Sequence, residues 1–508
     1  MQKKRWWYLV FCLFPAISSA QGESFREVTQ QTLLTNPEVQ ARFNLWQAAR
    51  EERAVAAGGF YPRLDVSASS LREERRRFGA DNRYTVGQAT VTLTQMLFDG
   101  FATRNEVSRL DHVALIRFFE MHDISENMAL EVVRAYSDVA RYRELVKLGE
   151  ENYARHRAIF DLIQEKVQAG VARRVDLETS SGRMALAEAN LLTEVSNLHD
   201  VTARFTRLTG RVPAADIGLR PDLSGLLPAN ATTALERAVR RNPALWAALL
   251  NVRASRSAAR ARDANFMPRL DLQARSANGR NVDGIAGHDT TNSIGLVLNW
   301  NLYSGGSDMA RARQYALQLD AAQDMLEKSC RDVRQTVLIA YNDTQKLGSQ
   351  IQYLDQHQLA TEKARDAYRR QFDIGQRSLL DLLDTENELY QARRAFINAI
   401  HDLEIAYARV SASMGQLITS LALVSRGSDI LTELLRDGET DELVKRCQVD
   451  APVTPLINQE AIERRVAELK RESMANAGSL NVQMPVQVPL ARPPGPAVFE
   501  VSPPAAGR

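Results

Sequence analysis

The sequence predicts a membrane protein of mixed α/β class, in which four β-strands alternate with very long coiled-coil helices. Three observations predict this fold: an export signal at the N-terminus, a tandem duplication with an offset of about 205 residues, and, in each copy, a strand hairpin followed by a sustained helical repeat of apolar residues. We expect each copy to contribute one hairpin to a membrane sheet and one pair of long helices outside it.

The composition excludes several classes of function. The chain has 508 residues, a formal net charge of +2 and 25% charged residues, which gives no electrostatic case for nucleic acid. Its seven histidines and three cysteines lack metal-binding spacings, and the sequence has no phosphate loop, GxSxG elbow or GxGxxG turn. We expect a protein that is not an enzyme, with no catalytic residues, no metal and no cofactor.

The N-terminus has the features of a signal peptide. Residues 3–5 are basic, residues 6–17 are apolar and residues 18–20 are small. The apolar stretch is shorter than the roughly 20 residues that span a bilayer as a helix. We predict a signal peptide at residues 1–20 and export of the mature chain; the alternative is a membrane anchor. Cys12 has no lipobox before it, so we expect no lipid attachment there.

Two copies of one unit follow. Asn36-Pro37 recurs as Asn242-Pro243, and Phe-Tyr-Pro-Arg-Leu-Asp at 60–65 recurs as Phe-Met-Pro-Arg-Leu-Asp at 266–271, both 206 residues later. Further matches at an offset of 205 pair Gly170 with Gly375, Asp176 with Asp381, and Gly210 with Gly415. A single change of register across such a length predicts a tandem duplication. The predicted parts are repeats at 21–211 and 232–417, a linker at 212–231 and a C-terminal extension at 418–508.

Each copy begins with a helix, predicted at residues 23–57 and 232–264. We expect the first helix to end at Gly58-Gly59, because glycine adopts a left-handed cap at little cost.

Alternating segments then predict one strand hairpin in each copy, with loops around 75–83 and 278–291. The apolar positions that alternate with polar ones are Leu64, Val66, Ala68, Ala89, Val91, Leu93, Leu270, Leu272, Ala274, Ile294, Leu296, Leu298 and Trp300. Asn299 and Asn301 point to the opposite face. Such alternation fits a barrel wall between lipid and water, and it also fits the half-buried hairpin of a soluble sandwich.

Long helices follow the hairpins and favour the membrane interpretation. Apolar residues at heptad spacing run from Val107 to Val146 in the first copy and from Met309 to Leu354 in the second. Each helix extends for some 65–70 residues, about 100 Å, and a second helix returns from a glycine turn. Cys330 lies on the apolar stripe, so we interpret it as a packing residue.

Four strands per chain cannot close a barrel, and an open sheet edge in lipid leaves backbone groups unpaired. If the membrane interpretation holds, we therefore expect closure by further copies of the chain.

The signal peptide, duplication, hairpins and long helices together resemble the TolC family of outer-membrane efflux proteins, over residues 23–418. The resemblance implies a homotrimer, with a twelve-stranded β-barrel in the Gram-negative outer membrane continuous with a periplasmic α-helical coiled-coil barrel. It also implies two partners, a periplasmic adaptor protein and an inner-membrane ABC or proton-driven pump.

Residues 375–384 resemble the family's signature at the periplasmic tip. The resemblance implies that Asp381 and Asp384 form rings at the pore constriction, and that Arg377 and a tyrosine tie them to Asp176. Phe372 stands where the tyrosine is expected, which removes that hydroxyl link. Gly170 and Gly375 match the periplasmic hairpin turns. An alternative is that Ser378 and Asp381 serve only as a capping box at the start of a helix.

The predicted function is that of a passive outer-membrane exit duct in a tripartite export system. The Phe-Tyr-Pro-Arg-Leu-Asp element and the missing lipobox favour type I protein secretion over small-molecule efflux, which is the alternative. An alternative of another class is a trimeric periplasmic coiled-coil structural protein. In the extension, residues 459–473 predict an amphipathic helix, and the Pro-rich chain after about 485 predicts disorder.

Overall fold

The computed structural model describes residues 24–77, 80–215, 217, 223–427, 440–447, 449–451 and 457–479. The predicted signal peptide and the Pro-rich end lie outside the described residues. The chain forms two compact units, Met1–Ala451 and Pro452–Arg508. Within the described residues, none of the helices has the length and apolar character needed to cross a membrane.

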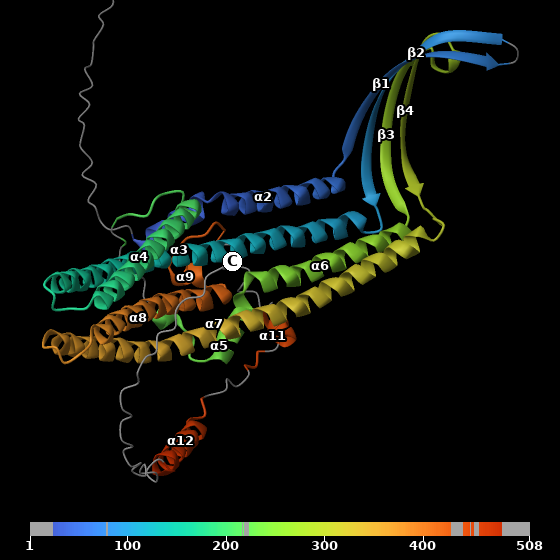
Figure 1. The fold of residues 1–508 in the computed structure, drawn as a ribbon. Coiled ribbons are helices and arrows are strands. Elements are labelled where there is room, and N and C mark those ends of the chain that lie inside the picture. Colours follow the sequence, from blue (N-terminus) through green and yellow to red (C-terminus); the bar gives the residue numbers. More distant parts are fainter. Residues whose placement is uncertain are drawn as a thin grey trace, which may run out of the picture. The chain divides into compact units, whose positions relative to one another are not determined.

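The first unit holds two similar series of elements (Figure 1). The first series comprises α1 (Phe25–Thr35), α2 (Pro37–Ala57), β1 (Arg63–Arg77), β2 (Ala80–Phe98), α3 (Ala102–Gln168) and α4 (Arg174–Thr209). The second comprises α5 (Ala231–Arg241), α6 (Pro243–Asp263), β3 (Arg269–Arg280), β4 (His288–Asn299), α7 (Ser307–Asp373) and α8 (Leu379–Ser413), followed by α9 (Leu417–Ser420) and α11 (Thr440–Arg446). The second unit contains α12 (Gln459–Ser479), the predicted amphipathic helix.

Each expected first helix is in fact two helices. The chain breaks at Asn36 and at Asn242, whose backbones are extended because a residue before proline disfavours the helical conformation. Each asparagine then caps the next helix, since its Oδ1 accepts the backbone N–H of Glu38 or Ala244 at 2.9 Å.

The predicted left-handed cap at Gly58-Gly59 is also wrong. Gly58 has φ −53° and begins a short 3₁₀ turn, Gly58–Phe60, that leads into β1. The left-handed conformation occurs instead at Gly210, which ends α4 with φ +75°.

The four strands form one antiparallel sheet in the order β1-β2-β3-β4. The two hairpins meet along β2 and β3, and among the described strands β1 and β4 each pair on one side only. The strands extend further than the sequence predicted, since β1 continues to Arg77 and β2 begins at Ala80, within the expected loop.

The register gives the sheet one apolar and one polar face. Leu64 pairs with Leu93, Val66 with Val91, and Leu272 with Leu296, so the predicted apolar positions within the four strands share a face. These side chains are exposed on β1, β2 and β4 and half-buried on β3, whereas Thr90, Asp271 and Ala277 on the other face are buried. Outside the membrane, such an exposed apolar surface would be costly.

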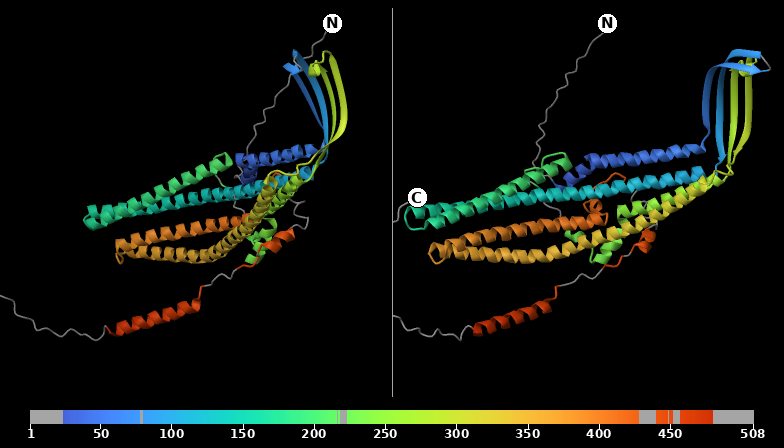
Figure 2. Two further views of the ribbon diagram at one scale, coloured as in Figure 1. Left: turned by 90° about the vertical axis from the view of Figure 1, so that its right-hand side faces the viewer. Right: turned by 45° about the vertical axis from the view of Figure 1, so that its right-hand side comes forward.

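The long helices have the predicted length and core. Helices α3 and α7 each have 67 residues, about 100 Å at 1.5 Å per residue. The hairpins α3–α4 and α7–α8 lie side by side with their turns at the same end, away from the sheet (Figure 2). The predicted stripe on α3 is buried, including Phe118, Val132 and Val139. On α7 only its central part is buried, from Leu326 to Thr344, and Met309 is exposed.

A disulfide overturns the interpretation of Cys330 as a packing residue. Its sulfur is bonded to that of Cys447, directly after α11, across 117 residues of sequence. The same segment places Leu443 in the core and pairs Glu442 with Arg253 of α6 at 3.1 Å. The two cysteines outside the predicted signal peptide were the available sequence signal, because an exported chain is expected to form disulfides.

Candidate functional site

The two hairpin turns contain the predicted glycines. Gly170 lies between α3 and α4 with φ +74°, and Gly375 lies between α7 and α8 with φ +76°. In each turn the residue after glycine donates its backbone N–H to a carbonyl of the preceding helix, Val171 to Lys166 at 2.9 Å and Gln376 to Gln371 at 2.8 Å. A positive φ is a conformation that glycine adopts at least cost, so this residue type suits both turns.

Asp381 lies in the first turn of α8 and forms a capping box with Ser378. The Ser378 hydroxyl accepts the backbone N–H of Asp381 at 3.2 Å, and the Asp381 carboxylate accepts the backbone N–H of Ser378 at 3.3 Å. The carboxylate also accepts the Ser378 hydroxyl at 2.8 Å. The helix-cap role is therefore present in the structure, and a role at the pore is compatible with it.

Arg377 contacts its own hairpin rather than Asp176. Its Nε donates to the Gln371 side chain at 3.1 Å, its guanidinium lies 4.4 Å from the centre of the Tyr368 ring, and Asp381 is 3.8 Å away. The sequence analysis did not predict this contact with Tyr368, although a tyrosine one helical turn before Phe372 could have suggested it.

The other two acids have different partners. Asp384 pairs with Arg183 of α4, which joins the second hairpin to the first. Asp176 lies in the first turn of α4, where Arg173 is 3.8 Å from its carboxylate. Within the described part of the single chain, the structure does not bring Asp176 into contact with Arg377, Asp381 or Asp384.

Phe372 joins the two hairpins through apolar packing. It lies against a buried cluster near the turns, and the Lys166 ammonium of α3 is 5.2 Å from its ring centre. The cluster comprises Ile159, Ile163, Val167, Leu177, Leu379, Leu382 and Leu383. An apolar contact thus stands where the resemblance implied a tyrosine hydroxyl.

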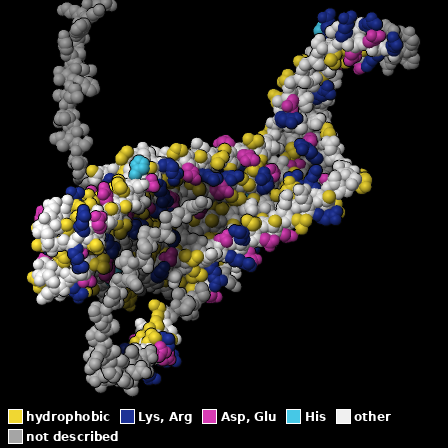
Figure 3. All heavy atoms as spheres, in the orientation of Figure 1, with side chains coloured by type: hydrophobic (Ala, Val, Ile, Leu, Met, Phe, Trp, Pro, Cys, Tyr) yellow, Lys and Arg dark blue, Asp and Glu magenta, His cyan; other side chains and the backbone are white. Residues whose placement is uncertain are grey.

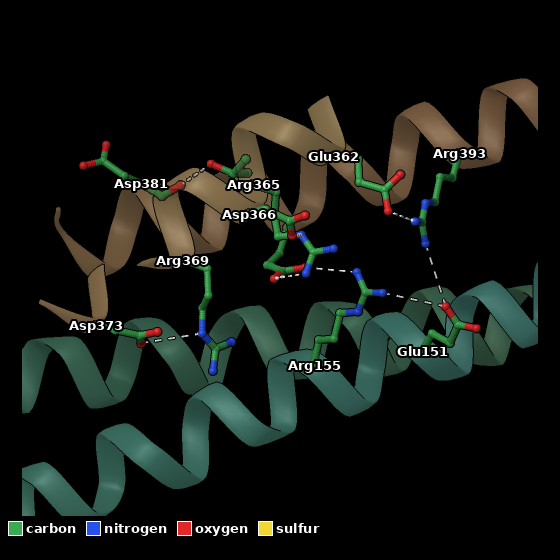
Figure 4. A network of polar contacts seen from close by, with 11 residues as sticks. Glu151, Arg155, Glu362, Arg365, Asp366, Arg369, Asp373, Asp381 and Arg393 are labelled. Carbon is green, nitrogen blue, oxygen red and sulfur yellow. Dashed lines mark hydrogen bonds and ion pairs between the residues drawn. The ribbon is translucent and has the colours of Figure 1, made fainter. Parts of the chain in front are cut away.

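A network of ion pairs links α3, α7 and α8 further along the hairpins (Figure 4). Its centre is Glu386 of α8, which is 2% exposed and lies 3.5 Å from Arg155 of α3 and 3.7 Å from Arg365 of α7. Arg155 also lies 3.8 Å from Glu151 on its own helix.

Arg393 of α8 extends this network. It pairs with Glu362 of α7 at 2.7 Å and lies 3.9 Å from Glu151 of α3 (Figure 4). Because removing one partner of a buried pair leaves the others uncompensated, such a network resists separation of the helices. The sequence analysis missed it, since interspersed charges on long helices do not indicate which of them meet.

Exposed aromatic residues surround the junction between sheet and helices. They are Phe60, Tyr61, Phe101, Phe266, Trp300 and Tyr303. Trp300 donates its indole N–H to the carbonyl of Phe266 at 3.2 Å. Amphipathic rings at one end of an apolar band are typical of a membrane–water interface. Aromatic residues at the ends of the predicted strands were the sequence signal.

An exposed apolar sheet face, aromatic residues at one border and two hairpins of about 100 Å define the class of outer-membrane channels that continue into a helical barrel. Residues 28–211 and 234–416 match the family described as outer membrane efflux protein. The chain belongs to this family, and the fold class predicted from the sequence is confirmed.

Individual relatives agree with this assignment. The chain is 26% identical to outer membrane efflux protein BepC of Brucella suis over 72% of its length and 79% of BepC. It is also 26% identical to the alkaline protease secretion protein AprF of Pseudomonas aeruginosa over 76% of its length and 83% of AprF. The CmeC outer membrane channel of Campylobacter jejuni, at 15% identity, has a similar fold with a TM-score of 0.71, covering 82% of this chain and 90% of CmeC.

Proposed function

We propose that this protein is the outer-membrane exit duct of a type I protein secretion system, through which cargo passes passively from a pump and adaptor to the exterior. The observation that carries the duct is the four-stranded sheet, which has an exposed apolar face and in which, among the described strands, β1 and β4 pair on one side only. Lipid would cover the face, and further copies of the chain would pair with the edges.

A trimer fits the sheet best. Three chains of four strands give twelve strands, a number that closes a barrel with a water-filled interior. The polar face, with Ser67, Gln88 and Thr92, would then line the duct, and the paired hairpins would form its periplasmic wall.

Asp381 and Asp384 are the proposed constriction residues, with Arg377, Phe372 and Asp176 as the residues that hold the tip together. Three-fold symmetry would bring three copies of each acid around one axis. Acidic rings at a narrow point favour cations. The turns at Gly170 and Gly375 would form the periplasmic end, which docks the adaptor.

Type I secretion is preferred to small-molecule efflux on two observations. AprF is named for protease secretion, and the chain lacks a lipobox before Cys12. The similarity to BepC, which is named as an efflux protein, supports efflux as the second candidate.

The test has two parts. The mass of the detergent-extracted protein should correspond to a trimer, and the protein should fractionate with outer membranes; a stable monomer in the soluble fraction would contradict the duct itself. Deleting the gene should then abolish the secretion of a protein substrate by an ABC exporter of the same cell. Loss of drug resistance with secretion intact would identify efflux instead.

A further inference from the structure

The apolar face of the sheet changes to a basic surface at the end away from the helices. Along β3 this face passes through Leu270, Leu272 and Ala274, continues with the polar Ser276 and Asn278, and ends at Arg280, which pairs with His288 on β4. On β1 it continues to Arg72, which pairs with Thr85. Arg83 pairs with Glu74 on the same face, and Arg76 is the next outward position. Figure 3 shows Lys and Arg side chains gathered at this end.

We define the outer rim as Arg72, Arg76, Arg83, Arg280 and His288. All five are exposed; the side chains of Arg76 and Arg83 are 75% and 67% accessible. Among the described residues, two acidic residues belong to this part of the face. Glu74 lies 3.2 Å from Arg83 and 3.8 Å from Arg76, and Asp81 is opposite Arg76 in the strand register. Arg72 and Arg280 have no ion-pair partner among the described residues. The outer rim therefore carries excess positive charge.

The opposite face at the same level is neutralised internally. Arg75 donates to the Asp283 carbonyl at 2.7 Å and pairs with its carboxylate at 3.1 Å. The Tyr84 hydroxyl donates to Glu73 at 3.0 Å. Uncompensated basic charge is therefore a property of the outward face, not of the whole hairpin end.

The depth of the outer rim matches a headgroup layer. Leu270 and Arg280 are ten residues apart on β3, about 34 Å of strand. At a tilt of about 40° this length places the outer rim about 26 Å from the aromatic border, close to the height of the lipid-facing band of a membrane barrel. The exposed aromatic residues lie at the other border of the band.

We propose that the outer rim binds the phosphate groups of lipopolysaccharide, the phosphorylated glycolipid of the outer leaflet. The inference rests on the proposed function, because the helices must be periplasmic for this end of the sheet to meet that leaflet. Guanidinium groups bind phosphate through paired, charge-assisted hydrogen bonds. Arginines placed at headgroup depth on a lipid-facing surface therefore fit an anionic glycolipid.

The test compares the glycolipid bound to purified variants. The double variant Arg72→Gln/Arg280→Gln removes two rim charges without leaving a carboxylate unpaired. Arg275→Gln is the matched control, since Arg275 is exposed on the polar face of the same strand. We expect the double variant to retain at least roughly tenfold less lipopolysaccharide per trimer, since the loss of one charge-assisted hydrogen bond alone implies that factor and two arginines are removed. The control should retain the wild-type amount. Equal retention by an assembled double variant would overturn the proposal.

A second arm uses the unaltered protein, so it remains decisive if the double variant does not assemble. Delipidated protein should bind native lipopolysaccharide, but bind its dephosphorylated form at least several-fold more weakly. Equal binding of both forms would mean that acyl chains alone account for the contact, and binding of inorganic phosphate with the same affinity would reveal a general anion site; either result overturns the proposal. Failure of the wild-type protein to form a trimer or enter outer membranes would instead contradict the proposed duct.

Discussion

At the scale of single residues, the two proposed constriction acids differ in what holds them. Asp381 takes part in a capping box within its own helix, whereas Asp384 pairs with Arg183 across the two hairpins. A substitution that removes charge and cap together cannot separate pore electrostatics from helix stability. Asparagine at both positions removes the charge and keeps an acceptor for the cap.

The double variant Asp381→Asn/Asp384→Asn should lower cation selectivity in planar bilayers, because acidic rings attract cations. Trimer stability should change by no more than about 1 kcal/mol, since the cap acceptor remains and the Asp384 pair is exposed. Reversal potentials in a salt gradient measure the selectivity, and thermal dissociation measures the stability. Unchanged selectivity together with a less stable trimer would mean that these carboxylates act only as structural groups.

Glu126 of α3 is a second residue with a measurable consequence. Burial raises the pKa of its carboxyl to about 8, although the backbone N–H groups of Leu417 and Ile418 donate to it and act in the opposite direction. A folded-state pKa above the unfolded value of 4.5 stabilises the fold at low pH. That stabilisation is lost as the pH rises from about 4.5 to 8.

Between pH 6.5 and 9 the free energy of unfolding should therefore fall by about 2 kcal/mol in the wild type. The Glu126→Gln variant should lack this fall, because its amide does not titrate and still offers an acceptor to Leu417. Thermal unfolding of both proteins at the two pH values measures the difference. Asp123, whose negative charge repels that of Glu126, is present in both proteins. Parallel pH profiles would mean that Glu126 is ionised throughout this range.

At the scale of elements, the apolar periodicity of the sequence predicted the buried face of each long helix, but it did not predict which partner covers that face or where the shorter helices end. The α3 stripe is buried as predicted because α2, α4, α6 and α8 all pack against that helix. Toward its two ends the α7 stripe is exposed or half-buried in the single chain, as at Met309 and Leu354. The proposed trimer would cover those ends. A heptad pattern indicates a buried face without indicating which chain supplies the partner.

The predicted helix boundaries were wrong where a single residue changes the backbone conformation. The Asn-Pro steps at 36 and 242 break helices that composition alone favours, since the proline restricts the residue before it. In the candidate site, the turn glycines and acids could be located from the sequence. The Glu386 network could not, because its members lie on three helices and meet only after folding.

The face of β4 gives a direct test of the membrane interpretation. Leu298 lies on the exposed apolar face and Asn299 on the polar face. Arginine at Leu298, two positions from the aromatic border at Trp300, should impair assembly by up to about 1 kcal/mol, because the cost of a lipid-facing arginine is smaller near the interface than at the midplane. Arginine at Asn299 should be tolerated. The yield of trimer in outer membranes measures both variants. Equal tolerance would show that the strand faces are assigned the wrong way or that lipid does not contact this sheet.

The Glu386 network predicts a contribution to closure of the hairpins. Glu386→Gln removes the buried carboxylate that Arg155 and Arg365 share and leaves them with only the exposed Glu151 and Asp366 as partners, which costs at most about 3 kcal/mol. Separation of α3 from α8 should then become easier, and single-channel conductance should rise. The control is Glu388→Gln, an exposed glutamate on the same helix. If the conductance rises in neither variant, the network has only a structural role.

At the scale of the whole molecule, the two repeats keep the same internal contacts. The Asn36 amide donates to the Leu208 carbonyl at 3.0 Å, and the Asn242 amide donates to the Ser413 carbonyl at 2.9 Å. Each copy thus fixes its first helices against the end of its returning helix. The copies differ in α11 and its disulfide, which connect to α6 and α7 of the second copy. The duplication is therefore visible in the sequence. The difference between the two copies depends on one disulfide between distant cysteines, which the sequence pattern does not indicate.

The Cys330–Cys447 bond also makes a closed covalent ring. The ring contains the second half of α7, the turn at Gly375 and all of α8, so one wall of the proposed gate is part of a loop with no free end. Closing a loop of 117 residues restricts the unfolded chain by about 5 kcal/mol. Reduction should lower the thermal stability of the wild type and leave Cys447→Ser unaffected. Since this bond forms only in an oxidising compartment, thiol labelling of newly made chains should mark the moment at which each one leaves the cytoplasm and closes its ring.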